Sequence, residues 1–260
     1  VQVCHRYNLQ IRYYSIGVDF RPTNLNLKCD EWLYIVNYYG QISNYEIEVM
    51  KSIYDRVIVD NVQAYFQEPI DGFETLYTCR KFFGVPDGAV LYTDKQIEIN
   101  EVDQSYTRMH FLLGRYEKTA GEFYQEYVDN NHLFKDEPIK RMSRLTENLL
   151  HGLDYELVKT RRTENFAYLH EQFKAVNQLK LICPSGAFMY PLYLPNGAEI
   201  RKKLQAHKIF IPILWPAVFN ICDEGELEYN MAKNILPIPV DQRYTIDDMN
   251  YIVNILETMR

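Results

Sequence analysis

Residues 57–64, Val57-Ile58-Val59-Asp60-Asn61-Val62-Gln63-Ala64, give the clearest indication of the fold. Its three β-branched apolar residues, followed at once by a carboxylate, are typical of a short buried strand that ends at Asp60. Ligands of open, mostly parallel sheets bind beyond the carboxyl ends of the strands. We therefore expect Asp60 to lie at a ligand-binding edge of the sheet. Gln63 follows it three residues later.

Short apolar runs on both sides of this stretch alternate with a helical pattern. We expect further strands over residues 11–16, 32–39, 74–78 and 89–93, and a helix over residues 44–54. Ser43 or Asn44 is the expected N-cap of that helix. Strands separated by helical connectors predict a mostly parallel sheet, and the turn at Tyr39 then lies at a strand end, as Asp60 does.

The rest of the chain predicts a helical connector and a small second domain. Apolar spacing predicts helices over residues 105–128, 139–150, 155–173, 198–207 and 245–259. Seven of the eleven prolines lie between Pro184 and Pro239, beside strand-like runs at 188–194 and 209–218. We expect the second run to be a bent core strand. We therefore divide the chain into the remaining part of a large sheet domain (1–104), a helical connector (105–173) and a small C-terminal α+β domain (174–260).

The composition argues against several classes of protein. The chain has 260 residues and a net charge of −7, whereas a nucleic-acid-binding domain ordinarily carries a basic face. Its five cysteines are an odd number without paired spacing, which favours a reducing compartment and hence the cytoplasm. No histidine or cysteine grouping predicts a metal site. The longest apolar run, 209–218, is about half the length of a membrane-spanning helix, so we expect no membrane segment.

A second stretch supplies the chemistry: Thr78-Cys79-Arg80-Lys81-Phe82-Phe83-Gly84-Val85-Pro86-Asp87-Gly88-Ala89. Pyridoxal phosphate (PLP) needs a lysine amine that forms a Schiff base and a carboxylate that keeps its ring nitrogen protonated. Lys81 and Asp60 are candidates for these roles, Gln63 for a hydrogen bond near the ring oxygen, and Thr78 for a contact with the phosphate or the lysine loop. Taken singly, an aspartate after a strand is ordinarily a turn residue and a lone lysine is ordinarily a surface residue. Only their combination favours a cofactor site.

Several stretches together resemble the DegT-type sugar aminotransferases. Residues 59–64 resemble the family's E-D-A-A-Q-A, with the aspartate and the glutamine at matching positions. The further matches are residues 19–22 to D-V-D-P, residues 32–41 to the strand that ends in H-x-Y-G, residues 78–89 to a subgroup with S-x-R-K-x-x-x-V-P-D-G, and residues 236–244 to the segment before the last helix. The resemblance covers nearly the whole chain.

This resemblance implies an α/β protein of PLP-dependent transferase fold type I, with a partial, mostly parallel central sheet and a small C-terminal α+β domain. It implies cofactor contacts from Asp60, Gln63, Thr78 and Lys81, and a substrate contact from Tyr39. Members of the family transfer an amino group from an amino acid such as glutamate to a nucleotide-linked keto-sugar, in deoxysugar and lipopolysaccharide biosynthesis. They act as homodimers whose sites lie at the subunit interface.

Two alternatives remain on the same fold. PLP-dependent sugar dehydratases carry a histidine in place of the lysine, whereas this chain has Lys81. The other alternative is a non-catalytic or regulatory protein that retains the fold. The chain begins at Val1 rather than at a methionine, and the family's Gly-Thr/Ser phosphate-binding turn lies upstream of the matched region. We therefore expect an N-terminal segment that precedes Val1.

Overall fold

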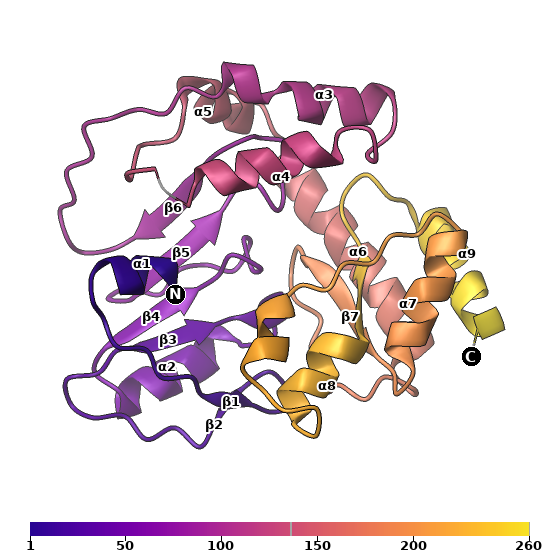
Figure 1. The fold of residues 1–260 in the computed structure, drawn as a ribbon, viewed down its shortest axis with the longest axis horizontal. Coiled ribbons are helices and arrows are strands. Elements are labelled where there is room, and N and C mark those ends of the chain that lie inside the picture. The colour runs from indigo at the N-terminus through magenta and orange to yellow at the C-terminus, as the bar shows by residue number, and fades with distance from the viewer. Residues whose placement is uncertain (136, 260) are drawn as a thin grey trace.

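A four-stranded sheet organises the N-terminal half of the chain (Figure 1). The computed structural model describes residues 1–135 and 137–259. The strands, in their spatial order, are β3 (Leu33–Val36), β4 (Val57–Asp60), β5 (Glu74–Thr78) and β6 (Ala89–Tyr92). β3 and β5 run parallel to β4, and β6 runs antiparallel to β5. The expected α/β class and mostly parallel sheet are confirmed, and β4 and β5 have the predicted bounds.

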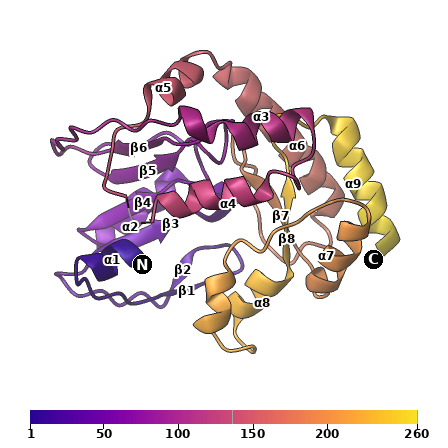
Figure 2. The same ribbon diagram turned by 45° about the horizontal axis from the view of Figure 1, so that its top comes forward.

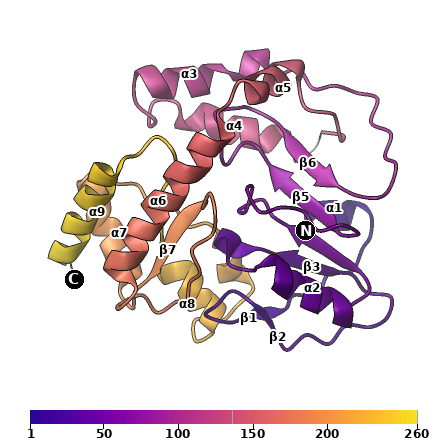
Figure 3. The same cartoon turned by 180° about the vertical axis from the view of Figure 1, so that it is seen from behind.

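One face of the sheet is covered by helix α2 (Asn44–Ile53). Because side chains alternate along a strand, every second strand residue packs into the core beneath this helix. That core contains Leu33, Ile35, Ile42, Ile47, Val57, Val59 and Phe73. Ser43 caps the helix, since its hydroxyl accepts a hydrogen bond from the N–H of Glu46 and the Glu46 carboxylate accepts one from the N–H of Ser43. The short helix α1 (Gln2–Arg6) lies on the opposite face of the sheet (Figures 1 and 3).

Two of the expected strands are shorter in the structure. The strand expected over 32–39 ends at Val36 because the chain turns into a 3-10 helix, η1 (Tyr38–Gly40). Tyr39 and Gly40 have φ values of 55° and 70°, in the left-handed region, which ends the extended conformation. The strand expected over 11–16 is reduced to β1 (Ser15–Ile16), which pairs antiparallel with β2 (Pro22–Thr23).

The connector contains more helices than we expected. Its elements are η2 (Tyr106–Arg108), α3 (His110–Glu117), α4 (Tyr124–Leu133), α5 (Arg144–His151) and α6 (Tyr155–Phe173). The prediction of one helix over 105–128 is wrong, because the chain breaks after α3 and Phe123 packs onto Gly114. A Cβ atom on Gly114 would lie 2.1 Å from that ring. α5 begins later than predicted, at the cap Ser143, whereas α6 has the predicted bounds.

The C-terminal half is built on an antiparallel pair of strands, β7 (Met189–Tyr193) and β8 (Ile235–Pro239), which lie side by side in Figure 2. Its helices are α7 (Gly197–Ala206), η3 (Pro216–Asn220), α8 (Leu227–Asn234) and α9 (Ile246–Met259). α6 runs from the connector into this half and packs against α9 (Figure 1). The bent strand expected over 209–218 is wrong. Proline has no N–H to donate to a ladder, so Pro212 interrupts pairing, and Pro216 begins η3.

None of the helices within residues 1–135 and 137–259 is long and apolar enough to cross a membrane. All five cysteines are free thiols. The domain boundaries at residues 104 and 173 remain predictions.

Candidate cofactor site

Asp60 ends β4 with its carboxylate held by two donors. Its Oδ2 accepts a hydrogen bond from the phenol of Tyr34 at 2.8 Å, and its Oδ1 accepts one from the N–H of Val62 at 3.0 Å. Tyr34 lies on β3, two residues before Val36, which is the register partner of Asp60. Because side chains alternate along a strand, Tyr34 and Asp60 point to the same face of the sheet. Burial, together with the neighbouring Asp60 charge, raises the pKa of Tyr34, so its phenol stays a donor. The carboxylate is therefore fixed in orientation, and each of its oxygens has lone-pair capacity for a further donor.

Lys81 lies in the loop that follows β5. The carbonyl of Cys79 accepts hydrogen bonds from the N–H groups of Phe82 and Phe83, at 3.1 and 2.9 Å, and so forms a tight turn around the lysine. Lys81 is exposed as a residue, but protein atoms crowd its ammonium group, and Nζ lies 5.5 Å from the centre of the Phe188 ring. This desolvation lowers the pKa of Lys81, the charge of Asp60 partly opposes it, and the adjacent Arg80 lowers the pKa further.

Asp60 is thus the carboxylate whose charge acts on the predicted amine. A lowered pKa favours the neutral form of an amine, which is the nucleophilic form. Arg80 itself turns away from the site. Its guanidinium donates to the side chain of Asn131 at 2.6 Å and lies 4.3 Å from the ring centre of Phe134.

Gln63 holds the turn at the end of β3. Its Oε1 accepts a hydrogen bond from the N–H of Tyr39 at 2.8 Å, and the side chain is buried. Across the part of the chain that the structure describes, Nε2 of Gln63 donates to no protein group, which leaves this donor for a ligand. The Tyr39 ring is 1% exposed and packs in the core against Phe20 and Trp215. A substrate contact from Tyr39 stays a prediction.

Thr78 is the last residue of β5, and its hydroxyl forms no hydrogen bond within the described ranges. Asp60 pairs in register with Leu76, so Thr78, two residues further along, lies on the same face of the sheet as the Asp60 carboxylate. Asp60 and Thr78 therefore share one face at the carboxyl ends of neighbouring strands. The role of Thr78 in phosphate binding remains a prediction.

The far end of the lysine loop is anchored by Asp87, which is 2% exposed. Its carboxylate accepts hydrogen bonds from the N–H of Ser143 at 2.7 Å, from the hydroxyl of Ser143 at 2.9 Å, and from the hydroxyl of Thr146. Ser143 is the N-cap of α5, so Asp87 ties the loop to that helix. Gly88 has a φ of 104°, which only glycine adopts readily. Asp87 was not among the predicted site residues, although an aspartate directly before a glycine is a signal of a tight turn.

These side chains fit one end of PLP. An amine with a lowered pKa, an oriented carboxylate and the free Nε2 of Gln63 match the aldehyde, the ring nitrogen and the ring oxygen, respectively. On the phosphate side, the one candidate that we named among the described residues is the Thr78 hydroxyl, and its role stays a prediction. The donor set therefore suits the ring of the cofactor better than its phosphate.

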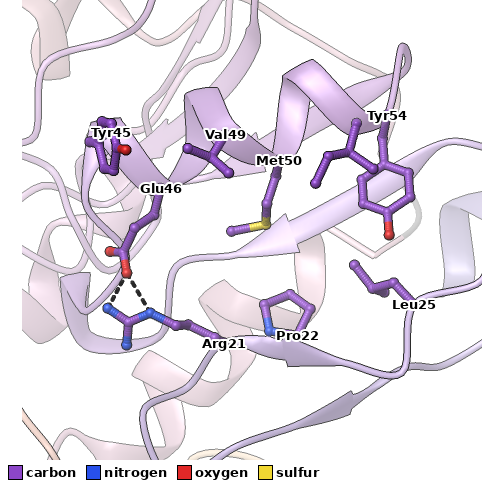
Figure 4. A pocket seen from close by; sticks show the side chains of 9 residues that line it. Arg21, Pro22, Leu25, Tyr45, Glu46, Val49, Met50 and Tyr54 are labelled. Carbon is purple, nitrogen blue, oxygen red and sulfur yellow. Dashed lines mark hydrogen bonds and ion pairs between the residues drawn. The ribbon is translucent and has the colours of Figure 1, made fainter.

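A hollow of about 500 Å³ in the surface is not at this site. It lies between α2 and residues 21–25, and Figure 4 shows Val49, Met50 and Leu25 around it. Arg21, at its edge, is paired with Glu46. A smaller hollow of about 200 Å³ lies beside Gln63 and the loop of residues 182–187. The candidate site is therefore formed by the side chains at the strand ends, outside the first hollow and beside the second.

No protein-family model matches the sequence, and no curated protein is detectably similar to it. Solved structures are similar in fold. Sugar aminotransferase CalS13 from Micromonospora echinospora aligns with a TM-score of 0.56 and 16% identity, over 98% of this chain and 76% of that chain. A DegT DnrJ EryC1 StrS aminotransferase from Brucella abortus gives a TM-score of 0.51 at 14% identity, over 87% of this chain and 63% of that one.

A third structure, S. venezuelae DesV in complex with a ketimine intermediate, gives a TM-score of 0.52 at 14% identity, over 87% of this chain and 64% of that one. This chain thus spans less than two thirds of two of these three structures and about three quarters of the first. At such identities the likeness concerns the fold. The chain has the α/β fold of the DegT/DnrJ/EryC1/StrS sugar aminotransferases, fold type I.

Proposed function

We propose that this chain carries the site of a PLP-dependent aminotransferase, with Lys81 as the residue that binds the cofactor aldehyde. The observation that carries the proposal is the Lys81 amine held against the Phe188 ring, with its pKa lowered by desolvation and with Asp60, at the end of β4, as the carboxylate that acts on it. The sugar-aminotransferase fold supports it. The proposed reaction transfers an amino group from an amino acid such as glutamate to a nucleotide-linked keto-sugar. The proposed protein is a cytoplasmic homodimer.

PLP, when bound, supplies an electron sink for a carbanion. Asp60 would hold a proton on the ring nitrogen, because opposite charges at close range favour both ionised forms. Tyr34 would keep the Asp60 carboxylate aimed at that nitrogen. Nζ of Lys81, whose lowered pKa favours the neutral amine, would accept a proton from the substrate and return it to another carbon. Gln63 would donate from Nε2 to the ring oxygen.

A spectral titration tests this proposal. Adding PLP to the purified protein should produce the visible absorbance band of a lysine-bound cofactor, and a Lys81→Ala variant should lose it. Lys95, which forms an ion pair with Glu74 on the sheet, provides the matched control, and Lys95→Ala should keep the band. If the Lys81→Ala variant kept both the band and transaminase activity with glutamate, the proposal would fail.

One observation favours a second candidate, a non-catalytic protein that retains the fold. The donor set described above suits the ring of the cofactor better than its phosphate, as expected of a fold that no longer holds PLP. This candidate predicts that no PLP binds while Lys81 is intact. A sugar dehydratase is distinguished by its product, since it removes oxygen from the sugar and transfers no amine.

A further inference from the structure

Arg162, on α6, is a buried cation that the proposed chemistry does not use. Its side chain is 2% exposed, and within residues 1–135 and 137–259 it forms no ion pair with a carboxylate. Burial lowers the pKa of Arg162 to about 10, although the charge of Asp241 opposes this. Burying a guanidinium without a paired carboxylate is unfavourable unless hydrogen bonds satisfy it. Its partners therefore indicate what it contributes to the molecule.

The first partner is the residue directly after Lys81. The carbonyl of Phe82 accepts a hydrogen bond from the Arg162 guanidinium at 3.2 Å and another from Nε2 of Gln242 at 2.9 Å. Nε of Arg162 in turn donates to Oε1 of Gln242 at 2.8 Å, so the two side chains act on this carbonyl as one unit. The Phe82 ring lies with its centre 4.7 Å from the guanidinium. Both the main chain and the side chain next to Lys81 are thus fixed.

The second set of partners belongs to the segment that carries Phe188. The guanidinium of Arg162 also donates to the carbonyls of Ala187 and Phe188, at 3.0 and 3.3 Å. Phe188 is the residue whose ring lies 5.5 Å from Nζ of Lys81. One side chain therefore fixes the lysine loop and the apolar wall that crowds its amine.

Gln242 is held in place by the same helix. One turn after Arg162, Nδ2 of Asn165 donates to the carbonyls of Val240 and Tyr244, at 3.2 and 3.0 Å. These contacts fix the loop on either side of Gln242. The arrangement is a rigid connection from α6 to the carbonyl beside Lys81.

We propose that Arg162 and Gln242 are a positioning pair that sets where the Lys81 amine lies against Phe188 and Asp60. The inference rests on the proposed role of Lys81 as the cofactor lysine. The charged groups that act on Lys81 are Asp60, from β4, and Arg80, from its own loop. Arg162 acts on the amine only through the Phe82 and Phe188 main chain.

Competitive acetylation of the whole cofactor-free protein, read by mass spectrometry across pH, tests the proposal. We expect Arg162→Met and Gln242→Leu to move the midpoint of Lys81 labelling upward, toward that of an ordinary lysine, because the amine leaves its crowded position. At neutral pH, Lys81 should then be labelled several-fold more slowly than in the wild type. Gln242→Glu keeps the acceptor for Arg162 but loses the donor to Phe82. Its labelling midpoint should therefore lie between those of the wild type and of Gln242→Leu.

Arg201 provides the matched control. It is 7% exposed and donates to the carbonyls of Lys233 and Ile235, away from the lysine loop. Arg201→Met should destabilise the protein without moving the Lys81 midpoint. An unchanged midpoint in a folded Arg162→Met or Gln242→Leu variant would overturn the proposal. If Arg162→Met does not fold, the Gln242 variants decide alone.

Failure of the proposed function gives a different result. Because the labelling is done without cofactor, the midpoints shift whenever the pair positions the amine, even if PLP never binds Lys81. A shifted Lys81 midpoint in the variants, with no cofactor band in the wild type, would support the positioning role of Arg162 and Gln242 and refute the aminotransferase proposal.

Discussion

The Asp87→Asn variant should destabilise the protein by about 3 kcal/mol. In the wild type the buried carboxylate accepts three hydrogen bonds, from the N–H and hydroxyl of Ser143 and the hydroxyl of Thr146. An asparagine keeps one oxygen and places an NH₂ group against a donor. One charge-assisted hydrogen bond is then lost and two become neutral, each change being worth about 1 kcal/mol or somewhat more. The lysine loop would lose its attachment to α5.

Urea unfolding followed by circular dichroism measures this loss. With an m value of about 3 kcal/mol/M, the midpoint should fall by about 1 M. Asp94→Asn, an exposed aspartate beyond β6, is the matched control and should leave the midpoint unchanged. If Asp87→Asn lowered the free energy of unfolding by less than about 1 kcal/mol, the three hydrogen bonds would not have the expected strength. Buried charge-assisted hydrogen bonds are worth more than this.

Three further variants test other parts of the account. Gly88→Ala should cost about 1–3 kcal/mol, because φ is 104° and the new Cβ would lie 3.1 Å from Thr146; unchanged thermal unfolding would contradict this. Tyr34→Phe should weaken PLP binding several-fold in a spectral titration while hardly changing stability, since Tyr34 is 42% exposed as a residue and its hydroxyl donates to Asp60. Lys81→Met should raise stability at neutral pH, because a lowered pKa means that the folded state disfavours the charged amine. That gain should shrink as the pH rises through the lowered pKa toward 10.5, and a gain that grew with pH would be inconsistent with it.

The sequence predicted the elements whose signals are local. β4 begins with three β-branched apolar residues, β5 is rich in threonine, leucine and tyrosine, and the serine cap of α2 lies at the predicted position. The break between α3 and α4 depends on Phe123 folding back onto Gly114, a tertiary contact that helical periodicity does not contain. The apolar run before η3 looked like a strand, but its prolines and the 74% exposure of Phe210 rule that out.

In the candidate site, too, the sequence indicates some residues and not the partners that hold them. Asp60 and Lys81 could be placed from residue type, strand ends and a family resemblance. The partners that orient them could not, because Tyr34 comes from a neighbouring strand and Arg162 from a helix about eighty residues further along the chain. A signal for Arg162 was present in the sequence, since it and Asn165 interrupt the apolar stripe of α6 that contains Val158 and Phe166. Polar residues in such a stripe are buried and need partners, but the sequence does not identify them.

The most direct test of the central claim is to reduce the protein with borohydride in the presence of PLP and to map the modified peptide. The account predicts a single stoichiometric pyridoxyl group on Nζ of Lys81. It also predicts that Asp60→Ala abolishes the modification or weakens cofactor binding by at least tenfold. A pyridoxyl group on another lysine, or no modification with Lys81 intact, would contradict the account.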